Sequence, residues 1–118
     1  MSKLKIQPKG DQAAQIRQRK FELIRRFQLP EDLLPGSLSQ QNLRCGKSSC
    51  HCAQDEGHPV WSLTFMADGK KHVQHIPKHL VDEVRKRVEA GREYQDALRE
   101  VLAANARLLV LARKQRLI

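Results

Sequence analysis

The feature that most constrains this fold is an apolar stripe near the C-terminus, which recurs at alternating spacings of three and four residues. Its positions are Val81, Val84, Val88, Gly91, Gln95, Leu98, Leu102, Asn105, Leu109 and Ala112. This spacing predicts one face of a helix over about residues 78–115, roughly 55 Å long at 1.5 Å per residue. A chain of 118 residues has the length of one domain and cannot bury such a helix inside one globule. The helix therefore either folds back at Gly91 as a helical hairpin or pairs with a partner helix.

Pairing with a partner gives the stripe a role in oligomerisation. We expect that surface to comprise Val84, Val88, Leu98, Leu102 and Leu109, covered by a second copy or by another protein. The alternative is that an N-terminal helix covers the end of the stripe within the monomer.

The segments before this helix differ in amino-acid composition and in the structure they predict. Residues 1–10 read as a basic tail. Residues 11–29 predict an amphipathic basic helix, with Asp11 as its N-cap and Pro30 as its stop. A Cys/His loop and a β-hairpin occupy residues 37–77, and the long helix occupies residues 78–118 as a possible oligomerisation element.

The hairpin has the clearest local signal. Residues 60–66 have strand composition, and Asp68-Gly69 is a strong turn signal before a second strand over residues 71–76. Residues 37–44 alternate leucine with polar side chains and predict a third strand. The expected fold is therefore α+β: an N-terminal helix, a small antiparallel sheet of two or three strands with a cysteine-rich, zinc-like loop, and a long C-terminal helix or helical hairpin.

Three cysteines, Cys45, Cys50 and Cys52, lie within eight residues. An odd number in a short chain without an export signal argues against a disulfide framework. Three soft ligands in one loop suit a structural zinc ion, which needs four tetrahedral donors. We expect His58 to be the fourth ligand, with His51 as the alternative. Ordinary loop thiols, or a redox or nucleophilic cysteine, are the competing interpretations.

The charge is strongly basic, with 22 Lys and Arg against 13 Asp and Glu and a net charge of +9. Both ends are basic while the middle is mildly acidic, so a polyanion would meet the ends. We expect a nucleic acid, most readily DNA, to contact phosphate-binding side chains in the first helix, the hairpin and the start of the long helix. These are Arg17, Arg19, Lys20, Arg25, Arg26, Lys70, Lys71, Lys78, Arg85 and Lys86. The alternative is that these basic faces are only solvated.

Several classes of protein are disfavoured. No phosphate-binding loop, dinucleotide-binding fingerprint or zinc-protease motif is present, and we expect no enzymatic activity. No apolar run reaches the roughly 18 residues of a membrane span. The N-terminus lacks the apolar core of a secretory signal, so the expected compartment is the cytoplasm.

One combination of motifs resembles a known family. It comprises Gly36-Ser37-Leu38, the knot Cys45-Gly-Lys-Ser-Ser-Cys-His-Cys, Gly57-His58, Gly69-Lys70 and the helix start Ile76-Pro-Lys-His-Leu-Val. The chain is similar to a family of small bacterial proteins with a domain of unknown function, over Gly36 to about residue 115. The resemblance implies a companion of transposases and other mobile elements, with a transposase-like protein as a possible partner. It implies no catalytic residues.

Overall fold

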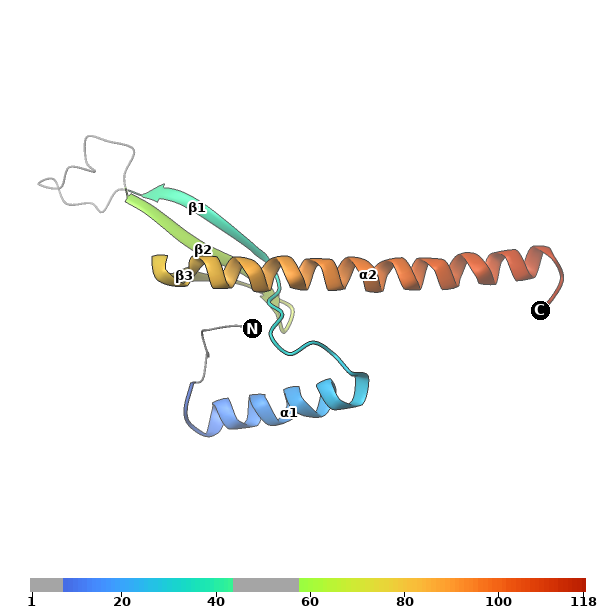
Figure 1. The fold of residues 1–118 in the computed structure, drawn as a ribbon, viewed down its shortest axis with the longest axis horizontal. Coiled ribbons are helices and arrows are strands. Elements are labelled where there is room, and N and C mark those ends of the chain that lie inside the picture. Colours follow the sequence, from blue (N-terminus) through green and yellow to red (C-terminus); the bar gives the residue numbers. More distant parts are fainter. Residues whose placement is uncertain (1–7, 44–57) are drawn as a thin grey trace, which may run out of the picture.

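A computed structural model of the chain describes residues 8–43 and 58–118. Along the chain the elements are α1 (Asp11–Phe27), β1 (Ser37–Leu43), β2 (His58–Ala67), β3 (Lys70–Ile76), the short 3-10 helix η2 (Lys78–Leu80) and α2 (Val81–Lys114). The α+β class with a three-stranded antiparallel sheet and a long C-terminal helix is confirmed. α2 lies across the sheet with its N-terminal part and extends far beyond it with the rest (Figure 1).

The sheet has the order β1-β2-β3, so β2 is central and β3 is an edge strand. Leu38 pairs with Leu63, and Trp61 pairs with Ile76. Asp68 and Gly69 join β2 to β3 with φ angles of 54° and 74°. Two positive φ angles define the type I′ turn that matches the twist of a hairpin, which is why the Asp-Gly signal predicted the connection correctly.

One face of the sheet carries the core. Leu63, Ile76, Val81, Val84 and Val88 are buried together, and Leu34, Leu38, Trp61, Phe65 and Leu80 pack around them. The strand residues alternate along β2, whereas the valines recur every three or four residues along α2. The helical and strand periodicities therefore meet at one small interface, which leaves the opposite sheet face without a helix among the described residues.

Gly91 lies inside one uninterrupted α2, so the helical hairpin considered from the sequence is wrong. The glycine is buried, and a Cβ atom built on it would collide with the carbonyl oxygen of Leu34. The Leu34 amide donates to the carbonyl oxygen of Arg87 at 3.1 Å. The connection between α1 and β1 thus passes directly against the α2 backbone, and only glycine leaves room for it.

α1 begins one residue after its N-cap, Gly10, and not after Asp11 as expected. It ends at Phe27, where Gln28 adopts the left-handed conformation and the Leu29 amide donates to the Ile24 carbonyl oxygen at 3.1 Å. None of its residues is buried, and it lies apart from α2 (Figure 1). The alternative in which this helix covers the end of the stripe within the monomer is therefore wrong.

Candidate nucleic-acid interface

The strand β3 and the turns on both sides of it form an exposed basic surface in the described part of the chain. We call this surface the β3 edge: Lys70, Lys71, His72, Gln74, His75 and Lys78, all of them exposed. No acidic residue lies between Gly69 and Val81. A seven-residue strand spans about 23 Å, so Lys70 at its start and Lys78 just beyond its end would contact different phosphates of one polyanion.

The lysines of this edge have no acidic partner within the described residues. Lys70 and Lys71 follow the hairpin turn as the first two residues of β3, and Lys78 is the first residue of η2. None of them forms an ion pair with a described carboxylate. Their charge is therefore not offset locally, and each is available for a phosphate.

Alternation along β3 divides the remaining polar side chains between the two faces. His72 and Gln74 pair with Phe65 and Leu63, so they share the face that carries the core. The His72 ring stacks on Phe65 with centroids 5.1 Å apart and an interplanar angle of 15°. Lys71 and His75 lie on the opposite face, where Lys71 pairs with Met66 and His75 pairs with Ser62. The stacking on Phe65 holds the His72 ring against the side of the sheet that carries the core.

At the start of α2, the predicted residues Arg85 and Lys86 differ in their surroundings. The guanidinium of Arg85 lies 5.2 Å from the ring centroid of Trp61 and forms an ion pair with Asp82 at 3.1 Å. Lys86 is exposed, and no described carboxylate pairs with it. Lys86 is therefore the better candidate for a phosphate contact, because Arg85 already has two partners.

The predicted basic residues of α1 lie mostly within local contacts. Arg17 donates to the Pro8 carbonyl oxygen at 2.7 Å, and Arg19 pairs with Glu22 at 3.2 Å. Lys20 and Arg26 lie over the rings of the residues that follow them, at 5.4 and 4.9 Å. Arg25 is exposed and has no such contact among the described residues. α1 is thus a second basic surface, separate from the β3 edge in Figure 1.

The predicted zinc ligands Cys45, Cys50 and Cys52, and the alternative ligand His51, lie outside the described residues. His58 is the first residue of β2 and pairs with Leu43, the last residue of β1. The ends of the cysteine-containing connection therefore meet at His58. Within residues 8–43 and 58–118, no three His, Cys, Asp or Glu side chains gather as metal ligands would.

The predicted oligomerisation residues fall into two groups. Val84 and Val88 are 4% exposed and belong to the core, because the sheet already covers this part of the stripe. They are not available to a partner, and this corrects their assignment to the oligomerisation surface. Leu98, Leu102 and Leu109 lie beyond the sheet and are more than half exposed.

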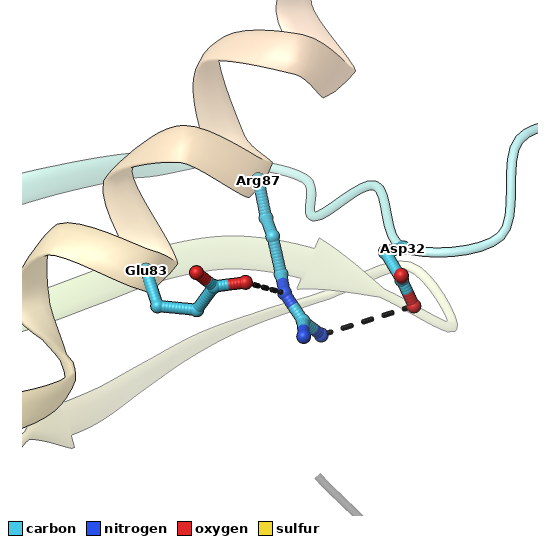
Figure 2. Close-up of polar contacts among 3 residues, drawn as sticks. All are labelled: Asp32, Glu83 and Arg87. Atoms are coloured by element: carbon cyan, nitrogen blue, oxygen red, sulfur yellow. Dashed lines mark hydrogen bonds and ion pairs between the residues drawn. The ribbon is translucent and has the colours of Figure 1, made fainter. Parts of the chain in front are cut away.

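One polar cluster was missed from the sequence. Arg87 donates to Glu83 at 3.0 Å and faces Asp32 at 4.0 Å, and its side chain is only 12% exposed (Figure 2). Asp32 lies in the connection between α1 and β1, so the cluster holds that connection onto α2 beside Gly91. The spacing of four residues between Glu83 and Arg87 would have predicted that one ion pair, because such residues are neighbours on a helix. Nothing local pointed to Asp32.

A comparison with protein families gives one match, over residues 13–86, to a domain of unknown function named DUF6788. The chain belongs to the DUF6788 family. The match begins within α1 and ends within α2, so both limits differ from the expected range of Gly36 to about residue 115. The DUF6788 match spans the sheet and the cysteine segment but leaves the exposed part of α2 outside. No curated protein and no solved structure matches the chain.

None of the helices in the described part of the chain has the length and apolar content needed to cross a bilayer.

Proposed function

We propose that this DUF6788 protein is a small basic accessory protein that binds nucleic acid, most readily DNA, through the β3 edge. The observation that carries the proposal is the run from Lys70 to Lys78, which holds three exposed lysines without an acidic partner among the described residues. Lys86 on α2 and the separate basic surface of α1 supply further positive charge. Contacts of this kind position a protein on phosphates and do not read sequence.

Salt dependence and a matched pair of variants test this proposal. We expect the protein to bind labelled duplex or single-stranded DNA at micromolar or lower concentration in low salt. Lys70→Gln/Lys71→Gln should weaken binding about 10-fold or more and reduce the slope of log K against log salt by about 2. The control is Arg107→Gln/Lys114→Gln, which removes two charges from the far end of α2 and should change binding little. Equal losses in both variants, or no binding at low salt, would contradict a site at the β3 edge.

We also propose a structural zinc ion held by Cys45, Cys50, Cys52 and His58. The support is chemical and topological: three thiolates suit zinc, and the pairing of Leu43 with His58 brings the ends of their segment together. Such an ion would order a connection in a domain with a small core.

We infer that the protein acts by binding and not by catalysis. We place it in the cytoplasm, beside a transposase-like protein of a mobile element.

Zinc content of the purified protein tests the metal site. We expect about one equivalent in protein expressed with ample zinc, and a loss of most of it in Cys50→Ser and His58→Ala. His51→Ala distinguishes the two candidate histidines, because only the true ligand should lower the zinc content. Less than half an equivalent in the wild type would exclude this site.

A second function has its own support in the exposed half of α2. The chain would then be a protein-interaction module whose helix docks another protein, and binding to DNA would be incidental. Binding through this helix should survive high salt and fail when Leu98 and Leu102 become polar, whereas phosphate binding should show the reverse pattern.

A further inference from the structure

Beyond Gly91, α2 continues for more than twenty residues without another described element beside it (Figure 1). Its apolar stripe continues there with side chains that are between 51% and 62% exposed. We call this part the seam: Leu98, Val101, Leu102, Asn105, Leu108 and Leu109. The seam keeps the spacing of three and four residues that buries Val81, Val84 and Val88 against the sheet. A contiguous apolar stripe of this kind marks a surface that is covered by a partner.

The charges along α2 select the occupant of the seam. Residues 101–118 contain Arg107, Arg113, Lys114 and Arg116 and no acidic residue. Residues 89–100 contain four acidic residues, Glu89, Glu93, Asp96 and Glu100, against two arginines, Arg92 and Arg99. A second α2 in antiparallel orientation would place each basic half beside an acidic half. A parallel copy would place the two basic halves side by side. The strongly basic α1 would likewise bring positive charge against the basic half of α2.

The heptad pattern sets the register of this antiparallel pair. Leu102 and Leu109 repeat at one interval of seven, and Leu98 and Asn105 at another, as the two core positions of a coiled coil do. In the register that interleaves them, Leu98 faces the partner's Leu109, and Val101 lies beside the partner's Leu108. Asn105 is the polar core position next to the two-fold axis, where it faces the partner's Leu102.

We propose that two copies of this chain form an antiparallel coiled-coil dimer through the seam. The sheets then lie at opposite ends, with the two copies of Val88 about 45 Å apart at 1.5 Å per helical residue. The dimer does not depend on nucleic-acid binding, since it uses none of the β3 edge.

Sedimentation of the full chain and of two leucine variants tests the dimer. We expect a wild-type mass of twice 13.6 kDa at micromolar concentration. Leu109→Asn should raise the dissociation constant about 100-fold or more, because the substitution enters the interface twice. Leu111→Asn is the matched control, since this neighbouring leucine is also exposed but lies off the seam, and it should leave the dimer intact. Helical circular dichroism checks that both variants remain folded.

Photo-cross-linking tests the orientation. With benzoylphenylalanine in place of Val101, the covalent dimer should carry its link near the partner's Leu108, whereas a parallel pair would be linked near the partner's Val101. A wild-type protein that remains monomeric at high micromolar concentration would overturn the proposal. A monomer that sediments with anionic lipid vesicles would also overturn it. Dissociation by Leu111→Asn but not by Leu109→Asn, or a parallel cross-link, would also overturn it.

Discussion

At the scale of single residues, Gly91 determines how the α1–β1 connection reaches α2. Glycine in a helix interior is unfavourable by about 1 kcal/mol relative to alanine. Here the missing side chain lets the Leu34 backbone approach the helix and hydrogen-bond to the Arg87 carbonyl oxygen. Arg87 secures the same crossing through Glu83 and Asp32. A residue that weakens the helix locally therefore permits a tertiary contact.

The substitution Gly91→Ala should consequently destabilise the protein although alanine is the better helix former. We expect a loss of about 1–3 kcal/mol in the free energy of unfolding, because the new methyl group meets a backbone carbonyl and not a flexible side chain. Urea denaturation measures this. Ala90→Gly at the exposed neighbouring position calibrates the propensity term and should cost about 1 kcal/mol. A gain in stability for Gly91→Ala would show that Leu34 does not pass this close.

At the scale of secondary-structure elements, α2 has two halves with different partners. The buried residues of the helix are Val81, Val84, Val88 and Gly91, all in its first eleven residues. The later residues contribute nothing to the core that the sheet and helix share. The edge strand β3 is likewise exposed along its length except at Ile76. The packed core therefore involves only the first part of α2, and the rest of the helix extends beyond it.

A chain shortened to residues 1–97 should therefore keep its sheet. We expect the amide resonances of β1, β2 and β3 to stay close to their positions in the full protein, while helical circular dichroism falls with the lost residues. The reason is that every buried side chain of the described core is retained. Collapse of the dispersed strand resonances would mean that residues after 97 do contact the core.

At the scale of the whole molecule, the protein is elongated. Its Cα radius of gyration is 20.7 Å and its principal extents are 75 × 36 × 29 Å. A compact chain of this length would have a radius of gyration of about 13.5 Å. The difference arises because α2 projects beyond the sheet and α1 lies apart from α2 (Figure 1).

Small-angle scattering of the monomeric protein should reproduce this elongation. For Leu109→Asn, or for any preparation shown to be monomeric, we expect a radius of gyration near 21 Å. A dimer joined at the far ends of α2 should give a clearly larger value, since the two sheets are far apart. A monomer near 14 Å would indicate that α1 or the end of α2 folds back onto the sheet.

The sequence by itself determined what depends on neighbouring residues: the long helix, the Asp68-Gly69 hairpin and the strand at residues 37–43. Periodicity and turn chemistry are local properties, so they can be read along the chain. Only the tertiary structure decided which half of the apolar stripe is buried, and that Asp32 and Leu34 meet Arg87 and Gly91. These contacts join segments far apart in the chain, and they depend on a crossing geometry that no residue spacing encodes.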